Sequence, residues 1–352
     1  MADIKRPDMD SLAPEVRAYI EFLEARLRQQ DRVSRRDTSQ AGRHDDEPIG
    51  PPEPPTTINL ITISSEGVAK RSPRHLYSRQ HRGGMGVFDL ECTGADVPAL
   101  LTLADERDDL ILFTDQGRAF RLPANRIQDS AVHARGSSMS AALGLNQGER
   151  VAVVLPDTGG NYIAALSRRG HVRWFAAHLF RRNLHPGSLL FDAAELGAPA
   201  AACWAANTDD LFIATHQGQG IRFSARQVPT RGCLGIRLDR DDTAVAITAV
   251  GPDSGVFLVS ADGRGAVRTM CGFRANKAPG AGGKAALRTD HLIGAAAITQ
   301  ADDVFLLSRL GKVIRFAGEE IPQKDGMVQG VNCMSLRSDE VVACVISAGL
   351  RE

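Results

Sequence analysis

Seven residues near position 80 combine cations with glycines in a pattern that suits anion binding. The run reads Gln80-His81-Arg82-Gly83-Gly84-Met85-Gly86. Glycine adopts positive φ at little cost and brings bare backbone N–H groups close to an anion, while Arg79 and Arg82 supply charge-assisted donors. Glycines beside arginines are also typical of an ordinary surface turn. The place of this glycine run (Gln80–Gly86) in the rest of the chain must therefore decide between phosphate binding and a plain turn.

The composition is that of a globular protein with many short elements. The chain has 352 residues, of which 43% are hydrophobic and 24% are charged, so it can bury a full core. Its 34 glycines and an aromatic content of only 5% favour short strands and tight turns over a few long helices. Because 42 cations balance 42 anions, any nucleic-acid or membrane partner would have to be bound by local charge.

The sequence predicts no membrane segment, no metal site and no cofactor. No apolar run approaches the length that spans a bilayer, and the polar start at residues 1–10 is unlike a signal peptide, so we expect a cytoplasmic location. The six cysteines stand singly, without the close pairs of zinc sites or redox motifs, and the histidines are equally scattered. We expect the cysteines to pack as small buried hydrophobes rather than to form a disulfide framework.

One amphipathic helix is expected within residues 1–36, with Ser11 as N-cap and Pro14 in the first turn. Its apolar stripe consists of Ala13, Val16, Ile20, Leu23 and Leu27. The stripe is short for an isolated coiled coil. The helix therefore either docks on another protein or a second copy of the chain, or forms a partly disordered arm. Residues 37–56, with an acidic run and five prolines, are expected to be a linker.

An internal repeat fills residues 57–352. One unit is an apolar strand, a turn with glycine, and a second strand that carries arginine. Its copies are Asn59–Arg71, Leu110–Arg121, Tyr162–Arg173, Leu211–Arg222, Val256–Arg268 and Val304–Arg315. The turn glycines lie roughly 45 to 53 residues apart, which is typical of propeller blades. Six copies predict six hairpins.

A second repeating unit is a short apolar strand before most of these hairpins, joined to the hairpin by an acidic turn. Its copies are Val97–Leu103, Arg150–Leu155, Ala198–Trp204, Thr243–Val250, Ile293–Thr299 and Val341–Ser347. The first hairpin lacks such a strand and the last strand lacks a hairpin. We therefore expect the last strand to pair into the blade begun at Asn59, which makes an all-β, closed six-bladed β-pinwheel or propeller. Two β-sandwiches side by side are the alternative, but they do not predict equal periods or complementary ends.

In this repeat context the chain resembles the C-terminal domain of the DNA gyrase and topoisomerase IV A subunits, a six-bladed β-pinwheel. Gln80, Arg82, Gly83, Gly84 and Gly86 match that family's box, whereas His81 and Met85 replace an arginine and a lysine. Two further segments, Gly67–Arg71 and Arg231–Leu238, also look like blade segments of that family. The resemblance implies DNA binding and bending around the rim. The substitutions imply binding weaker than the family norm, increasing as His81 protonates below about pH 6.5.

The chain as given lacks the features that an enzyme of this family would need. Only the short helix and the linker precede the repeat, so the sequence indicates a stand-alone relative without breakage-reunion domains. Tyr19, Tyr77 and Tyr162 stand in no recognisable catalytic context, and Tyr77 is expected to pack against the glycine run or to touch DNA. The run Gly280–Lys284 is followed by Ala285 rather than Ser or Thr, so it is no phosphate loop and looks like a degenerate box. We expect neither DNA cleavage nor ATP hydrolysis.

The sequence thus favours a DNA-binding module without sequence specificity, accessory to DNA topology and associated with the nucleoid. Residues 70–82 contain five cations and no acid, which gives a local patch. One arginine per blade would complete a basic belt if that position faces outward; an inter-blade salt bridge or a solvated charge is the alternative. The expected DNA-binding residues are Lys70, Arg71, Arg74, Arg79, Gln80, His81, Arg82, Gly83, Gly84, Gly86, Arg121, Arg173, Arg222, Arg268 and Arg315.

A second class of function is a propeller that has lost wrapping and serves as a protein-interaction platform. Its N-terminal helix would then be the docking element. The expected partners are therefore duplex DNA and, through the helix, either a topoisomerase or a second copy of the chain. The scarcity of aromatic residues argues against stacking of single-stranded bases in either case.

Overall fold

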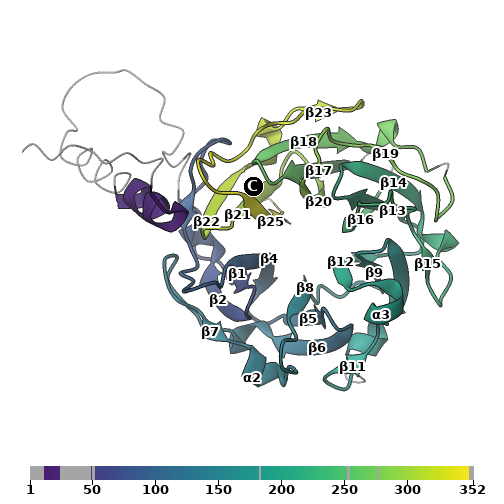
Figure 1. The fold of residues 1–352 in the computed structure, drawn as a ribbon, viewed down its shortest axis with the longest axis horizontal. Coiled ribbons are helices and arrows are strands. Elements are labelled where there is room, and N and C mark those ends of the chain that lie inside the picture. Colours follow the sequence, from purple (N-terminus) through teal and green to yellow (C-terminus); the bar gives the residue numbers. More distant parts are fainter. Residues whose placement is uncertain are drawn as a thin grey trace, which may run out of the picture.

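Six sheets, antiparallel except for one parallel pair at an outer edge, stand around a common axis and form a closed propeller (Figure 1). The computed structural model describes residues 12–23, 49, 52–181, 184–251, 254–275 and 277–348. We number the blades 1 to 6 by the order of their hairpins in the chain. The expected all-β, six-bladed fold is confirmed.

Each blade is described here from its innermost strand to its outermost one. Blade 1 has β4 (Pro98–Asp105), β1 (Ile58–Ser64), β2 (Val68–Pro73) and β7 (Ser137–Ser138), and blade 2 has β8 (Val151–Pro156), β5 (Asp109–Thr114), β6 (Arg118–Pro123) and β11 (Ser188–Leu189). Blade 3 has β12 (Pro199–Ala205), β9 (Tyr162–Ser167), β10 (His171–Ala176) and β15 (Cys233–Leu234), and blade 4 has β16 (Ala244–Val250), β13 (Asp210–Thr215), β14 (Gln219–Ser224) and β19 (Lys284–Ala285). Blade 5 has β20 (Leu292–Ile298), β17 (Gly255–Ser260), β18 (Arg264–Thr269) and β23 (Gln323–Lys324), with β24 (Val331–Asn332) also on β18, and blade 6 has β25 (Val341–Ser347), β21 (Asp303–Ser308), β22 (Lys312–Ala317) and β3 (Val87–Phe88). The outermost strands form the rim.

Short helices occupy the connections. A 3-10 helix follows each hairpin: η2 (Arg74–Leu76), η3 (Ala124–Arg126), η4 (Ala177–Phe180), η5 (Ala225–Gln227), η6 (Met270–Gly272) and η7 (Gly318–Glu320). Single α-helical turns form α2 (Ser140–Leu143) and α3 (Ala193–Leu196). An α-helix over residues 14–23 precedes the propeller.

The path of the chain corrects one expectation about how the ring closes. The innermost strand of each blade follows its hairpin in sequence: β4 pairs with β1, and β25 pairs with β21. The acidic turns therefore connect neighbouring blades rather than strands of one blade. The expectation that the last strand pairs into the blade begun at Asn59 is wrong. Instead β3 crosses back to blade 6, where Val87 faces Val313 and Phe88 faces Lys312, so the glycine run joins blade 1 to blade 6 rather than to blade 2.

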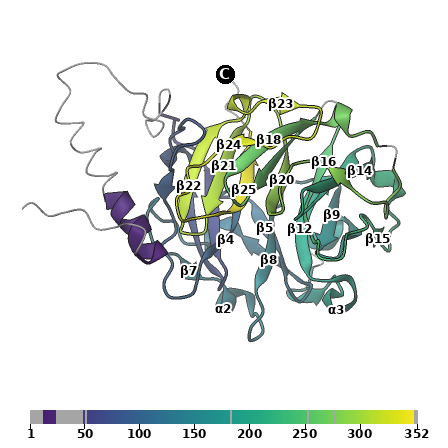
Figure 2. The same cartoon turned by 45° about the horizontal axis from the view of Figure 1, so that its top comes forward.

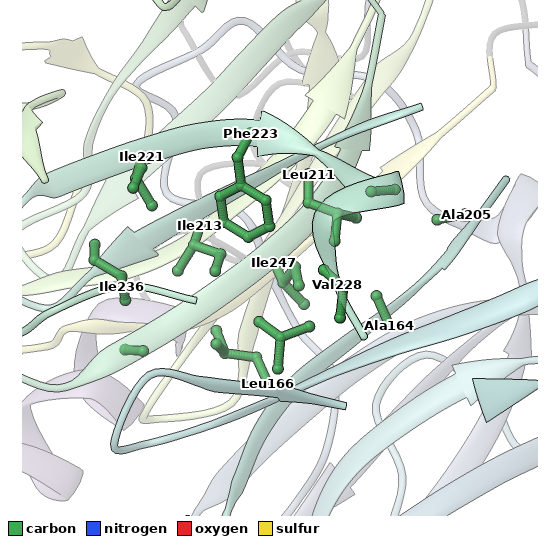
Figure 3. Close-up of a cluster of buried hydrophobic side chains, with 13 residues drawn as sticks. Ala164, Leu166, Ala205, Leu211, Ile213, Ile221, Phe223, Val228, Ile236 and Ile247 are labelled. Atoms are coloured by element: carbon green, nitrogen blue, oxygen red, sulfur yellow. The ribbon is translucent and has the colours of Figure 1, made fainter. Parts of the chain in front are cut away.

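Six apolar clusters fill the six junctions between blades, including the seam, by which we mean the junction of blades 6 and 1. Figure 3 shows the cluster between blades 3 and 4, in which Leu166 of blade 3 belongs to the same buried cluster as Ile213 and Phe223 of blade 4. Alternation along the middle strands sends apolar side chains to both faces of each sheet, so every blade needs two neighbours to bury them. A closed ring supplies those neighbours and leaves no blade face exposed.

The N-terminal helix docks on the propeller itself. Phe22 meets Phe88 of β3 edge to face, with ring centroids 4.9 Å apart, and Ala18 is 6% exposed. The buried carboxylate of Glu21 lies 3.4 Å from Arg337 Nη1 and 3.8 Å from Lys312 Nζ. The sequence analysis expected the helix either to dock on another protein or a second copy of the chain, or to form a partly disordered arm. It did not predict this intramolecular site. The expected N-cap at Ser11 and the stripe beyond Leu23 lie outside the described residues.

A residue of the expected linker takes part in the seam. Glu53 forms ion pairs with Arg74 of blade 1 and Arg315 of blade 6, both at 2.5 Å, and its side chain is 5% exposed. Burial raises the pKa of Glu53, but hydrogen bonds from Arg74 and Arg315 outweigh burial and hold this pKa below 4.5. The segment around Glu53 therefore belongs structurally to the ring closure. The boundaries 1–36, 37–56 and 57–352 stay a prediction.

The described part of the chain offers neither a membrane span nor a metal cluster. No helix in it combines the length and apolar character needed to cross a bilayer. Its histidines, cysteines and carboxylates do not gather in threes that could hold a metal ion. The six cysteines are free thiols, and burial raises the pKa of Cys203 and Cys344 to about 12. Only Cys333 is buried, four cysteines are half-buried and Cys271 is exposed, against the expectation that the six pack as buried hydrophobes.

Candidate nucleic-acid interface

The glycine run lies along the outer edge of blade 6 and leads into β3. Gly83 and Gly86 have positive φ, at 86° and 72°. A Cβ on Gly86 would lie 2.6 Å from the carbonyl oxygen of Val313, so only glycine lets the chain approach β22 closely enough for β3 to pair. The glycines at these positions thus serve ring closure.

The backbone amides of the run are bonded within the protein. Gly83 N donates to the Cys333 carbonyl at 2.8 Å, and Gln80 N donates to the Arg315 carbonyl at 2.8 Å. Gly86 N donates to the Gln80 side-chain oxygen at 3.2 Å. Gly84 N donates to the carbonyl of His81. The expectation that the run offers bare N–H groups to an anion is therefore wrong, because these groups hold the run in place.

Two side chains of the run, the exposed His81 and the half-buried Arg82, lie beside the carboxylate of Glu320, and Arg79 before the run pairs with Asp303. The Glu320 Oε2 atom accepts a hydrogen bond from Arg82 N at 3.1 Å and lies 3.2 Å from His81 Nδ1. The Arg82 guanidinium donates to the carbonyls of Glu320 and Asn332, both at 3.0 Å. Arg79 forms an ion pair with Asp303 at 2.8 Å, although its side chain is still 37% exposed. A DNA duplex that approaches these side chains would therefore find their positive charge partly neutralised by the carboxylates of Glu320 and Asp303.

The other cations of residues 70–82 are buried. Lys70 is fully buried; its Nζ lies 2.6 Å from Asp89 Oδ1 and donates to the Ala131 carbonyl. Burial lowers the pKa of Lys70 and Asp89 opposes this shift. Arg74 is 4% exposed and bonds Glu53. Arg71 is 8% exposed. The acid-free sequence segment is therefore not an exposed patch, because Glu53 and Asp89 fold over it.

Tyr77 is also internal. Its hydroxyl donates to Asp89 at 2.5 Å, and its side chain is 2% exposed. Burial and the negative charge of Asp89 raise the pKa of Tyr77 well above its ordinary value. Of the two roles expected for Tyr77, packing is the one that its environment allows.

The recurring arginines join neighbouring blades. In blade 4, Arg222 Nε donates to Asp210 at 2.8 Å and Nη1 donates to the Met270 carbonyl of blade 5 at 2.8 Å. The equivalent side-chain and carbonyl partners are Asn59 and Ile127 for Arg71, Asp109 and Phe180 for Arg121, and Asp303 and Tyr77 for Arg315. A guanidinium suits this position because it can bond a carboxylate and a carbonyl at once.

Two arginines of the repeat lie elsewhere in their blades. Arg268 is 2% exposed and donates to the carbonyls of Ala286 and Asp325, while the half-buried Arg173 packs over the Phe175 ring. The expectation of an outward basic belt is therefore wrong for Arg222, Arg268 and Arg315, whose side chains are buried. Arg121 and Arg173 are partly exposed. The alternative of an inter-blade salt bridge is met only in part: the ion pairs with Asp109, Asp210 and Asp303 lie within one blade, and the contacts to the next blade are hydrogen bonds to carbonyls.

A cation cluster lies on the rim of blades 4 and 5. Its members are the exposed Arg237, Arg274 and Lys284 and the half-buried Lys277. Arg237 and Lys277 both reach Gly282, and Lys277 Nζ donates to the Gly282 carbonyl at 2.6 Å. Burial and the nearby positive charges of Arg268, Lys277 and Arg274 lower the pKa of Lys284. Neither Arg237 nor Arg274 forms an ion pair with any residue that the structure describes.

Sequence reasoning missed this cluster, although a signal was present. Residues 263–288 hold six cations and no acid, which is a longer acid-free segment than residues 70–82. The degenerate box at Gly280–Lys284 leads into β19 on blade 4, as the glycine run leads into β3 on blade 6. Gly280 has φ 82°, close to that of Gly83. Here, however, no carboxylate within the described residues pairs with the cations of the cluster.

This geometry defines a class of protein. It is a six-bladed propeller in which the segment that follows each hairpin supplies the outermost strand of a neighbouring blade. A family model for the DNA gyrase C-terminal domain, beta-propeller, matches residues 59–90, 108–156, 209–250 and 302–346. Over these four segments the chain resembles the DNA gyrase C-terminal β-propeller family. The predicted resemblance to the gyrase A C-terminal domain is confirmed.

Individual relatives and structures agree with this family. The DNA gyrase A protein of Mycolicibacterium smegmatis is 27% identical over 302 residues, which is 81% of this chain and 36% of the relative. The corresponding protein of Haloquadratum walsbyi is 26% identical over 306 residues, which is 81% of this chain and 35% of that relative. The chain thus spans about a third of the length of these curated relatives.

Solved structures share the fold. A DNA gyrase A C-terminal domain superposes with a TM-score of 0.73 at 18% identity, covering 82% of this chain and 99% of that chain. A C-terminal domain of DNA topoisomerase IV gives a TM-score of 0.56 at 16% identity, covering 82% and 93%. The chain therefore resembles the non-catalytic C-terminal domain of gyrase A.

Proposed function

We propose that this protein binds and bends duplex DNA without sequence specificity, through exposed cations on its rim. The observation that carries the proposal is the cation cluster, whose charges have no carboxylate partners in the described chain. Contacts from lysine and arginine to phosphates release counterions and carry little base information. The family relationship supports the same partner, since the matched relatives are subunits of DNA gyrase.

The role that we propose is accessory to DNA topology, within the nucleoid and without catalysis by this chain. Bending even a few tens of base pairs costs several kcal/mol, so the contacts must extend along the rim. Arg231, next to β15 on blade 3, together with Arg237, Arg274 and Lys284 of the cation cluster, provides such an extended path. We expect neither strand cleavage nor ATP hydrolysis from the propeller alone.

A gel-shift titration on long duplex DNA at two salt concentrations tests this proposal. Replacing Arg237 and Arg274 by alanine should reduce the slope of log affinity against log salt by about 2, since each lost phosphate contact removes about 0.9. The matched control is Arg107→Ala with Arg126→Ala, two arginines outside the cluster. Absence of salt-sensitive binding, or equal losses in both variants, would refute DNA binding by the cluster. A linking-number assay on relaxed circles then separates bending from wrapping.

A protein-interaction platform is the second candidate, and one observation favours it. The face of the N-terminal helix that points away from the propeller exposes Val16, Tyr19 and Leu23, at 47%, 58% and 41%. These apolar side chains recur at helical spacing and would suit a topoisomerase surface or a second copy of the chain. Sedimentation of the wild-type protein and of Tyr19→Ser tests self-association. If the wild-type protein is a monomer at all concentrations, self-association is excluded, and binding to a different protein is the remaining form of this function.

A further inference from the structure

The N-terminal helix lies on the rim, where a circling duplex would have to pass. Figure 1 looks down the ring and shows the helix outside the circle of blades, next to β22; Figure 2 shows it beside the same strand from another angle. Phe22 contacts Phe88 on β3 and lies 5.5 Å from the ring of His133, in the connection that leads to β7. Since β3 and β7 are the outermost strands of blades 6 and 1, the helix bridges the rim at the seam.

The docked helix also changes the charge of this part of the rim. Glu21 is 7% exposed and places its carboxylate beside Lys312 and Arg337. Lys312 is left 8% exposed, and its ammonium lies 5.3 Å from the Phe88 ring centroid. One carboxylate thus lies beside two cations, of which Lys312 is buried and Arg337 is still 54% exposed. The seam therefore attracts DNA less strongly than the cation cluster on blades 4 and 5, whose charges no carboxylate of the described residues pairs.

The attachment of the helix is limited. Within the described helical residues 14–23, Ala18 and Glu21 are buried, Phe22 is half-buried against Phe88, and Arg17 donates a hydrogen bond to Ser338. Short isolated helices are marginal in water, so the cost of undocking lies mainly in these contacts. DNA that gained further phosphate contacts on the seam could compete with it.

We propose that helix 14–23 is a movable stop on the DNA path. When docked, it confines a duplex to an arc of the rim that includes blades 3 to 5. When released, it uncovers Lys312 and removes the Glu21 carboxylate from beside Arg337, and the contact extends across the seam. This inference rests on the proposed DNA binding and adds its regulation.

Hydroxyl-radical footprinting on a long duplex tests the stop. The variants are Phe22→Ala, which removes the ring contact, and Glu21→Gln, which keeps the packing and removes the charge. Both should protect a longer segment of DNA than wild type and bind long duplex several-fold more tightly. Binding to a duplex of about 20 base pairs, too short to follow the rim far, should stay unchanged. The control is Val16→Ala, on the exposed face of the same helix, which should behave as wild type.

Two results would overturn the stop. If wild type binds DNA and both variants protect the same length as wild type, the helix does not limit the path. If Val16→Ala lengthens the footprint as much as Phe22→Ala, docking is not the cause. Failure of the proposed function is distinguishable, because then wild type itself would show no salt-sensitive binding to either duplex.

Discussion

Arg315 donates a hydrogen bond to the backbone carbonyl of Tyr77 at 3.0 Å, and this contact joins the last blade to the first. The same guanidinium bonds Asp303 in its own hairpin at 2.8 Å. Arg222 repeats the arrangement between blades 4 and 5. The arginine of the repeat therefore connects successive blades around the ring, and the seam is closed by the same device as an internal junction.

Arg222→Ala should destabilise the protein by about 3 kcal/mol, because it leaves the partly buried Asp210 and the Met270 and Phe273 carbonyls without their donor. Urea unfolding followed by circular dichroism measures the change. At temperatures where the variant is folded, its DNA affinity should equal that of wild type, since the side chain is 7% exposed.

The control is Arg226→Ala, in the following 3-10 helix, where the side chain is exposed. Its effect on stability should stay below about 1 kcal/mol. If Arg222→Ala lost DNA affinity while its stability stayed unchanged, Arg222 would not act by connecting the blades. The hypothesis that the repeat arginines bind DNA as a basic belt would then be favoured again.

The hairpins were predictable because glycine turns recur at a regular spacing along the chain, as at Gly117 and Gly170. The pairing of the innermost strand of each blade was not predictable. The turn from Asp105 to Asp109 is short enough to join two strands of one sheet, and only the structure shows that it passes between blades. Sequence proximity favours local pairing, whereas packing of both sheet faces decides where each strand goes.

The site was less predictable than the fold. Arg222 and Arg274 are both arginines near a turn, yet one bonds carbonyls of a neighbouring blade and the other is exposed. Their burial depends on what folds over them, as Glu53 does over Arg74 from 21 residues away. The docking of Phe22 on Phe88 likewise joins residues far apart in sequence. Charge patterns along the sequence cannot distinguish such contacts from solvent exposure.

Gly86→Ala should impair closure of the ring. Position 86 has φ 72°, which costs an alanine about 1 to 2 kcal/mol, and the added Cβ would also clash with the Val313 carbonyl at 2.6 Å. Gly94→Ala is the matched control, since Gly94 has φ 67° but no neighbour within 4 Å of its Cβ position. The excess loss of stability in Gly86→Ala over Gly94→Ala, measured by thermal unfolding, isolates the close approach. If the two variants lost equal stability, β22 would shift away from the added Cβ at position 86 at little cost.

The Glu53 bridge should make the seam sensitive to acid. Because the folded state holds the pKa of Glu53 below its ordinary value of 4.5, the bridge contributes stability above that value. The contribution is lost as pH falls through the lowered folded pKa. Wild type should therefore be more stable than Glu53→Gln at neutral pH, and the difference should shrink in urea titrations below pH 4.5. Glu66→Gln, which removes an exposed pair with Arg150, should show a small difference at both pH values. A constant difference for Glu53→Gln would contradict the bridge.

Glu320→Gln should strengthen DNA binding at the glycine run. The carboxylate occupies the position beside Arg82 N and His81 Nδ1 that a phosphate oxygen would take, so removing its charge frees both donors for DNA. The Glu320 backbone carbonyl still accepts from Arg82 Nε, so the run should keep its conformation. We expect affinity for long duplex at low salt to rise about threefold, as for the loss of one exposed ion-pair partner. Glu319→Gln removes the same charge from the exposed neighbouring residue. An equal rise in both variants would show that net charge, rather than the occupied site, controls binding.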